Sequence, residues 1–185
     1  MIIAGKTALV TGANRGLGRQ LAAQLRDRGA HVYAAARDPQ AVDLTGVTPI
    51  ALDITDPAPV AKFFAPQLAA RGSSAVLNIL SALSWLSSPH SGAYSAAKSA
   101  EWSLTNALRL ELAPQGTRVT ALHVGYMDTD MTRRLDVPKS DPAVVAKLGI
   151  DGIAAGDAEI IADETSRRVL AGLSAGVAGL YPQVA

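Results

Sequence analysis

The stretch that decides the fold is Thr7-Ala-Leu-Val-Thr-Gly-Ala-Asn-Arg-Gly-Leu-Gly18, in a chain of 185 residues. It begins as a short apolar run typical of a β-strand, continues as a turn with three glycines, and leads into Arg19-Gln-Leu-Ala-Ala-Gln-Leu25. Leu17, Leu21 and Leu25 recur every four residues, so they share one face of a helix. The stretch therefore predicts a strand, a glycine turn and a helix that packs through its leucine face.

Other apolar runs along the chain predict further strands and helices. Strands are expected at residues 31–36, 47–52, 75–80 and 118–124, and helices at residues 60–71, 94–112 and about 158–173. Strands that alternate with helices are typical of a mainly parallel sheet covered by helices on both faces. We therefore expect a single α/β domain over residues 1–185 with about five strands. Residues 125–156 are expected to be rich in loops and to form a lid over a substrate.

The composition excludes several classes of protein. Hydrophobic residues make up 49% of the chain and charged residues only 18%, which excludes a disordered chain, a collagen-like fibre and a charge-rich coiled coil. The 17 basic and 16 acidic residues nearly balance and form no long run of either sign along the chain, so we expect a small-molecule partner and neither nucleic acid nor an anionic membrane. Without cysteine there is no thiolate metal site or cysteine nucleophile. The first residues do not resemble a secretory leader and no long apolar run follows, so a cytoplasmic protein is expected.

The glycine turn suits a phosphate group. Backbone N–H groups at the start of a helix attract phosphate, and side chains at Gly12, Gly16 and Gly18 would block its approach. The spacing Gly-x-x-x-Gly-x-Gly differs from the more general Gly-x-Gly-x-x-Gly, and a plain tight turn is the alternative interpretation. The strand before the turn and the helix after it favour phosphate binding.

Together with Tyr94-Ser-Ala-Ala-Lys98, the glycine stretch resembles the short-chain dehydrogenase/reductase family. Ser81 precedes Tyr94 by 13 residues, as the family serine precedes its tyrosine, and Gly125 and Thr129 stand where the family has Pro-Gly-x-x-x-Thr. The resemblance implies a Rossmann-type, doubly wound sheet, which in the family has six or seven strands. It also implies hydride transfer between a nicotinamide cofactor and a carbonyl or alcohol substrate.

The resemblance assigns catalytic roles to three residues. Tyr94 is the expected general acid/base at the substrate oxygen, and Lys98, four residues later on the same helix face, is expected to lower the pKa of its phenol and to hold the nicotinamide ribose. Ser81 is expected to hydrogen-bond the same substrate oxygen as charge develops there. The alternative is that Tyr94 is an ordinary surface residue and Lys98 a solvated charge.

Two arginines bear on the choice of cofactor. Arg37 ends the second predicted strand and Arg15 lies in the glycine turn, and two guanidinium groups suit the 2′-phosphate of NADP(H) better than the free ribose of NAD(H). Asp38 opposes this, because it could pair with Arg37. Asp53 resembles the family aspartate at the adenine ring, or it caps the following turn. The expected cofactor-binding residues are Gly12, Asn14, Arg15, Gly16, Leu17, Gly18, Arg37, Asp53, Gly125 and Thr129.

The chain also departs from the family between Asp53 and Ala75. The family has a helix, a strand ending in Asn-Asn-Ala-Gly and a second helix there, whereas this chain has about twenty residues, too few for a unit of about 30. We expect an internal deletion that removes a central strand. Either the strand that ends at Ser81 closes up beside the first strand, moving Ser81 by about 4.8 Å, or both strands keep open edges.

Three hypotheses about function follow. The first is an NADP(H)-dependent oxidoreductase that uses Ser81, Tyr94 and Lys98. The second is a catalytically impaired nucleotide-binding or interaction module derived from the same family, and the third is an aggregation-prone chain that folds only with a partner supplying the missing strand. Helix 94–112 offers a surface for a homo-oligomer. No metal site is expected, because His123 has no cluster of other ligands around it.

Overall fold

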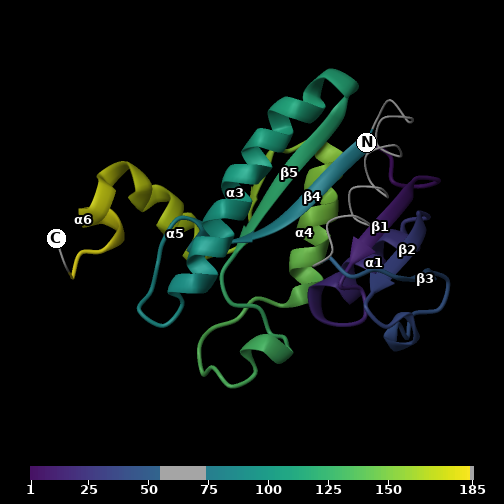
Figure 1. Cartoon of the computed structure of the whole chain (residues 1–185), viewed down its shortest axis with the longest axis horizontal. Coiled ribbons are helices and arrows are strands. Elements are labelled where there is room, and N and C mark those ends of the chain that lie inside the picture. Colours follow the sequence, from purple (N-terminus) through teal and green to yellow (C-terminus); the bar gives the residue numbers. More distant parts are fainter. Residues whose placement is uncertain (55–73, 184–185) are drawn as a thin grey trace.

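The structure is a computed structural model that describes residues 1–54 and 74–183. Its strands are β1 (Thr7–Thr11), β2 (His31–Ala36), β3 (Thr48–Ala51), β4 (Ser74–Ser81), β5 (Thr117–Val124) and β6 (Glu159–Ile161). Its helices are α1 (Gly16–Asp27), α3 (Gly92–Leu112), α4 (Pro142–Ala155), α5 (Glu164–Gly172) and α6 (Gly176–Leu180), with short 3₁₀ turns that include η1 (Pro39–Ala41), η2 (Ala82–Ser84) and η4 (Asp130–Thr132). Figure 1 shows α5 and α6 at one end of the molecule and β1 to β3 at the other. The helix expected at residues 60–71 lies outside the described residues.

The strands form two separate parallel sheets. One has the order β1-β2-β3 and the other the order β4-β5-β6. Within the described residues β1 and β4 do not pair, although each is the strand of its sheet that lies nearest to the other sheet (Figure 1). Of the two outcomes expected from the internal deletion, the described residues agree with the second, since no described strand pairs with the facing edges of β1 and β4.

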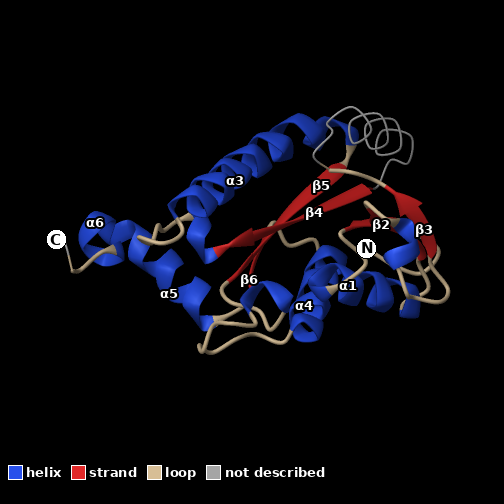
Figure 2. Ribbon diagram, turned by 60° about the horizontal axis from the view of Figure 1, so that its bottom comes forward, coloured by secondary structure: helices blue, strands red, loops and turns tan. Residues whose placement is uncertain are grey.

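Helices cover the two faces of the sheets. Asn78 of β4 donates to Thr105 of α3, whereas its neighbour Leu77 packs against the shared core on the opposite face, because successive side chains of a strand point to opposite sides. On that opposite face α1 and α4 pack against each other (Figure 2). The core there joins both halves of the molecule and consists of Val10, Ala13, Leu17, Leu21, Ala22, Ala30, Val32, Ala34, Leu122, Val124, Val145, Ala146 and Ile150.

The first half of the chain was predicted well. β1 and β2 have the predicted bounds, and β3, β4 and β5 differ from the predictions by one residue at each end at most. Gly29, with φ of +82°, allows the chain to leave α1 and enter β2.

Two predictions for the second half were wrong. Residues 125–156 are not all loop, since α4 occupies 142–155; Asp141 starts this helix by accepting from the N–H of Ala143 at 2.7 Å, and Pro142 stands at its first position. The helix expected at about 158–173 is divided, because Ile160 and its neighbours form β6 and Asp163 caps the start of α5. With the three-residue β6, the described residues contain six strands, close to the expected number of about five.

Candidate functional site

The predicted site residues follow the carboxyl ends of four strands. The glycine turn follows β1, Arg37 follows β2, Ser81 ends β4 and Gly125 follows β5. In parallel sheets covered by helices, ligands bind in the crevice outside these strand ends. The fold therefore brings the two halves of the predicted site to one edge of the molecule.

The glycine turn has the geometry that a phosphate requires. Gly12 and Gly16 have φ of +62° and +53°, a left-handed conformation that side chains disfavour. A Cβ atom on Gly18 would lie 2.7 Å from the carbonyl carbon of Gly12, so helix α1 can approach β1 this closely only with glycine there. No side chain caps α1, and nothing lies within 4 Å of the position that a Cβ on Gly12 would take. The N–H groups at the start of α1 therefore remain free for an anion.

The other residues of the turn contribute in different ways. Leu17 is buried in the core, so only its backbone is available to a cofactor, while Asn14 is half-buried beside the turn. Thr129 lies against the turn from the loop after β5, with its methyl group 3.5 Å from where a Cβ on Gly16 would be. Asp53 follows β3 and is exposed.

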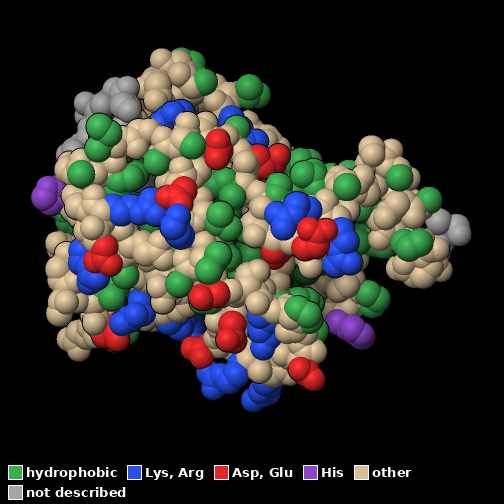
Figure 3. All heavy atoms as spheres, turned by 180° about the vertical axis from the view of Figure 1, so that it is seen from behind, with side chains coloured by type: hydrophobic (Ala, Val, Ile, Leu, Met, Phe, Trp, Pro, Cys, Tyr) green, Lys and Arg blue, Asp and Glu red, His purple; other side chains and the backbone are tan. Residues whose placement is uncertain are grey.

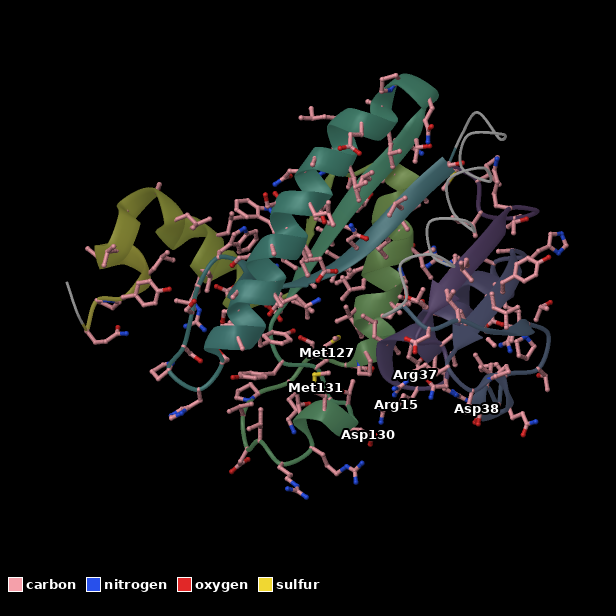
Figure 4. The ribbon with its side chains drawn as sticks, in the orientation of Figure 1. Arg15, Arg37, Asp38, Met127, Asp130 and Met131 are labelled. Carbon is pink, nitrogen blue, oxygen red and sulfur yellow. The ribbon has the colours of Figure 1, made fainter. Side chains whose placement is uncertain are left out.

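Both arginines lie on the surface at the same edge as the turn (Figure 4). The Arg15 side chain is 71% exposed and its guanidinium lies 3.7 Å from the carboxylate of Asp130, in the loop after β5. Asp38 accepts a hydrogen bond from the N–H of Gln40 at 2.9 Å and so starts η1. In the described part of the chain it makes no ion pair with Arg37. The two guanidinium groups are thus accessible to an anion. Asp38, which could have paired with Arg37, instead starts η1.

Ser81, Tyr94 and Lys98 come from neighbouring elements. The turn η2 packs against α3, where Ser99 Oγ donates to the carbonyl of Ser84 at 2.9 Å. Ser81 is buried, and its hydroxyl accepts from the N–H of Leu83 at 3.1 Å. Tyr94, in the first turn of α3, is 42% exposed.

The Lys98 ammonium group has two partners within the protein. It donates to the carbonyl of Ile79 at 2.8 Å and to the carboxylate of Glu101 at 2.6 Å. Among the described residues no hydrogen bond joins any two of Ser81, Tyr94 and Lys98. The fold therefore brings the three residues to one region.

Asp163 organises the site and was not predicted. Its carboxylate accepts from the N–H of Gly125 at 2.6 Å and from the N–H of Ser166 at 2.8 Å, so it ties the loop after β5 to the start of α5. The same loop is closed at its base, where Asp128 N donates to Ser140 O at 2.9 Å. An aspartate two residues before Thr165-Ser166 is a helix-start signal in the sequence, but its bond to Gly125 depends on the fold.

His123 lies beneath Ser81 and serves packing. Its ring stacks on Trp85 with centroids 3.8 Å apart and an angle of 14°. Its Nδ1 lies 3.4 Å from the Ser81 carbonyl, and its Nε2 lies 3.2 Å from the Glu159 carboxylate. Burial lowers the pKa of His123 below its usual 6.5, against the opposing effects of the Ser81 carbonyl and Glu159. A neutral, stacked ring here supports the end of β4 and β5.

The surface around the crevice has an apolar part and a part with mixed charges. The loop after β5 exposes apolar side chains, with Met131 84% exposed and Tyr126, Leu135 and Val137 more than a third exposed. On the face shown in Figure 3, basic and acidic side chains are intermingled and form no patch of one sign. Within the described residues no helix is long and apolar enough to cross a bilayer.

Comparison with known proteins identifies the family. The family model described as short chain dehydrogenase matches residues 6–65 and 47–139, which together span more than half of the chain. The human protein "Dehydrogenase/reductase SDR family member 4" is 26% identical over 198 aligned residues, which cover 74% of this chain and 71% of that protein.

Solved structures agree with the family match. A short chain dehydrogenase from Burkholderia cenocepacia J2315, in complex with NADP, superposes with a TM-score of 0.92 at 26% identity and covers 100% of this chain and 99% of that one. A 3-ketoacyl-(acyl-carrier-protein) reductase from Brucella melitensis, complexed with NADH, has a TM-score of 0.76 at 19% identity over 85% of this chain and 96% of that one. The Rossmann-type α/β fold is thus confirmed.

The matches also locate the internal deletion. The two pieces of the family match overlap at residues 47–65, so the discontinuity with the family falls within that range, between β2 and β4. The human relative is aligned over 198 positions, but 74% of 185 residues is only about 137, so about 60 of its positions have no counterpart here. The chain belongs to the short-chain dehydrogenase/reductase family, a group of NAD(P)-dependent oxidoreductases, and lacks an internal segment of it.

Proposed function

We propose that this protein is an NADP(H)-dependent oxidoreductase that interconverts a small-molecule carbonyl compound and the corresponding alcohol. The observation that carries the proposal is the uncapped start of α1 at the glycine turn, with two exposed arginines at the same edge. The preference for NADP(H) rests on Arg15 and Arg37, because guanidinium groups form paired, charge-assisted hydrogen bonds with phosphate.

Each predicted cofactor-binding residue has a proposed place. The backbone of the turn, Gly12 to Gly18 with Asn14 and Leu17, holds the pyrophosphate, and Asp53 lies toward the adenine. Gly125 and Thr129, in the loop after β5, hold the nicotinamide end. When bound, the cofactor supplies or accepts the hydride. The segment 125–156 acts as the substrate lid, and the exposed apolar side chains of its loop before α4 favour an apolar substrate.

The chain's own residues handle the proton. Tyr94 transfers a proton to the carbonyl oxygen during reduction and removes it during oxidation. Lys98 stabilises the phenolate form of Tyr94 when its ammonium group is close, and Ser81 donates a hydrogen bond to the same substrate oxygen. This assignment requires Lys98 to leave the Ile79 carbonyl and Glu101, and requires the Ser81 hydroxyl to turn toward the substrate.

That requirement favours a second candidate function. In this second proposal Lys98 stays with Ile79 and Glu101, so the chain binds the nucleotide through the glycine turn and does not use Lys98 in catalysis. A chain in this state binds the dinucleotide without turnover. The second candidate is therefore a nucleotide-binding module of the same family.

Cofactor titration followed by a turnover assay distinguishes the two candidates. We expect NADPH to raise the melting temperature more than NADH at equal concentration, because only NADPH carries the 2′-phosphate. With a panel of aldehydes and ketones, the oxidoreductase consumes NADPH, and Tyr94→Phe lowers kcat by about a hundredfold or more without weakening NADPH binding. Binding without turnover on any carbonyl supports the second candidate. No binding of either cofactor contradicts both.

Association of copies through α3 is also proposed. Leu104 and Leu110 on this helix are 59% and 79% exposed, which suits a helix that packs against a second copy. Sedimentation at several concentrations tests this. A cytoplasmic location and the lack of a nucleic-acid partner stay predictions from the sequence.

A further inference from the structure

Within residues 1–54 and 74–183, no strand pairs with the edge of β1 that faces away from β2. The N–H of His31 donates to the carbonyl of Lys6, so the even-numbered residues of β1 bond to β2. Leu9 and Thr11 therefore direct their backbone N–H and C=O groups to the other side, where no strand of the described chain lies. Leu9 is only half-buried, although it belongs to a strand that parallel sheets usually bury on both faces.

Within the same described residues, no strand pairs with the edge of β4 that faces away from β5 either. Ala121 and His123 bond to β6, so β5 meets β4 through its alternate residues. In this register the backbone N–H and C=O groups of Asn78 bond to β5. The backbone groups of its neighbours Leu77 and Ile79 therefore point the other way, toward the first sheet. Figures 1 and 2 agree that β4 is the strand of its sheet nearest to the first sheet. The facing edges of β1 and β4, with the backbone groups of Leu9 and Thr11 on one side and of Leu77 and Ile79 on the other, are called the slot below.

The floor of the slot is apolar and already built. A Cβ on Gly149 of α4 would lie 3.0 Å from Leu77 of β4 and 3.9 Å from Leu21 of α1, so these three elements meet there. Ala8 and Ile79 also pack against the shared core. An incoming strand would therefore find a ready apolar surface beneath it and need not create one.

Lys98 bonds to one of the backbone carbonyl groups on the slot side of β4. Its ammonium donates to the carbonyl of Ile79, which lies on the open edge of β4. A buried carbonyl without a partner costs free energy, and the ammonium group supplies that partner. The same bond ties Lys98 to the edge of β4 that faces the first sheet.

We infer that the slot between β1 and β4 binds an extended apolar peptide strand from another polypeptide, parallel to both strands, and that this strand displaces Lys98 from Ile79. The occupant is a segment of about five to eight residues that is rich in Val, Ile and Leu, because both faces of a central strand are buried. It contains no proline, because both of its edges form backbone hydrogen bonds. The human relative has about 60 aligned positions that this chain lacks, and the discontinuity falls within residues 47–65, between β2 and β4. A strand of that family segment is therefore the occupant that fits.

Peptide binding is measured first, without cofactor or substrate. The probe is the synthetic peptide Lys-Lys-Ile-Val-Val-Leu-Val-Asn-Asn-Ala-Gly, and the control replaces its first and third apolar residues by proline, which removes two N–H donors. Amide hydrogen exchange of the whole chain is followed by NMR. We expect the probe to slow exchange at Leu9, Thr11, Leu77 and Ile79 by about tenfold or more, and the control to leave it unchanged. Ala8 and Asn78, which already bond within the sheets, serve as internal references.

Three results overturn the inference. One is equal exchange at these four amides with and without the probe. Another is slow exchange at all four in the free monomer, which means that no slot is open. The third is slow exchange that appears only as the chain dimerises in sedimentation experiments, which means that a second copy is the occupant.

Lys98→Met tests the displacement. Without the ammonium group nothing must leave the Ile79 carbonyl, so the variant should bind the probe about tenfold more tightly than the unaltered chain. Lys147→Met is the matched control, since Lys147 pairs with Asp151 on the surface of α4 and lies outside the slot. Unchanged or weaker binding by Lys98→Met overturns the role of Lys98.

The displacement of Lys98 toward Tyr94 rests on the proposed function, but binding of the strand does not. If the probe binds and turnover of NADPH with a carbonyl substrate then rises about tenfold or more, both are supported. If the chain binds no dinucleotide at all while the exchange result holds, only the proposed function fails. If the dinucleotide binds and the exchange result is absent, only the strand site fails.

Discussion

Arg37 and Arg15 present two guanidinium groups at the edge where the glycine turn ends. Replacing Arg37 by alanine should weaken NADPH binding by about tenfold to a hundredfold, because a charge-assisted hydrogen bond to phosphate is lost. NADH binding should change little, since its ribose has no phosphate. The dissociation constants of both cofactors for the variant and the unaltered chain measure this.

Arg19→Ala is the matched control for Arg37→Ala. Arg19 is also an arginine near the start of α1, but it pairs with Asp43 at 2.8 Å. This pairing raises the pKa of Arg19 and lowers that of Asp43, mainly through the hydrogen bond that joins the two side chains. The control should bind NADPH as before. An equal loss of NADH and NADPH affinity in Arg37→Ala would mean that Arg37 does not contact the 2′-phosphate.

His123 makes the stability of the fold depend on pH. Burial lowers its pKa in the folded chain below the usual 6.5, so the unfolded chain takes up the proton first as the pH falls. The contribution of neutral His123 to stability is therefore complete above pH 6.5 and is lost as the pH falls through its lowered pKa. Glu159 opposes this shift and Arg109 adds to it.

Urea unfolding at several pH values checks the effect of His123. The free energy of unfolding should fall by at most about 1.4 kcal/mol for each pH unit below 6.5, until the folded chain takes up the proton too. In His123→Asn this dependence should disappear, whereas His90→Asn, which alters an exposed histidine, should retain it. A dependence that survives in His123→Asn would assign the effect to other groups.

At the scale of elements, the junction of β1 and α1 depends on Gly18. Alanine is usually better than glycine inside a helix, by about 1 kcal/mol. In Gly18→Ala the new Cβ would meet the carbonyl of Gly12, and backbone cannot move aside as a flexible side chain can. The clash should dominate and cost about 1–3 kcal/mol, and it should weaken binding of both cofactors.

Gly92→Ala provides the comparison for Gly18→Ala. Gly92 is the first residue of α3, and a Cβ there has nothing within 4 Å. This variant should be neutral or stabilised by up to about 1 kcal/mol. Thermal unfolding measures both variants, and similar stability of the two would show that the turn can open to accept a side chain.

Local signals explain why some elements could be predicted and others not. The strand–turn–helix from Thr7 to Asp27 carries its own periodicity, glycines and leucine face, so the sequence is sufficient to predict it. Helix α4 is apolar on nearly every side because it lies between two halves of the core, and Gly149 and Gly152 weaken its helix signal. Strand β6 has three residues and exists only because β5 offers an edge.

The candidate site likewise has features that the sequence predicts and features that it does not. The positions of Ser81, Tyr94 and Lys98 at one edge follow from the order of elements, which the sequence shows. The partner of the Lys98 ammonium cannot be predicted in this way, because the Ile79 carbonyl is available to it only when no strand pairs with that edge of β4. The role of Asp163 likewise depends on a contact between residues 38 positions apart.

At the scale of the whole molecule, two sheets without a common ladder must be held together by side chains. The shared core does this: Val10 and Ala34 come from the first sheet, Leu122 and Val124 from the second, and Ile150 from α4 between them. Because no backbone hydrogen bonds join β1 to β4, cooperative folding depends on this packing.

Ile150→Ala should therefore destabilise both halves together. Ile150 is fully buried, and removal of its side chain leaves a cavity that costs about 2–5 kcal/mol. Trp85 and Trp102 report on the half that contains β4, β5 and α3, because the chain has no other tryptophan. Hydrogen exchange at Val32 and Ala34 reports on the first sheet.

Tryptophan fluorescence and hydrogen exchange should show the same loss of unfolding free energy in Ile150→Ala. Val144→Ala is the control, because it alters an exposed residue of the same helix, and it should change the unfolding free energy by no more than about 0.5 kcal/mol in either measurement. If tryptophan fluorescence and exchange gave different free energies of unfolding, the two sheets would unfold independently. The slot between them would then open by separation of the halves. Equal losses mean that α1 and α4 hold the edges of β1 and β4 at a fixed distance, which a strand needs if it is to bond to both.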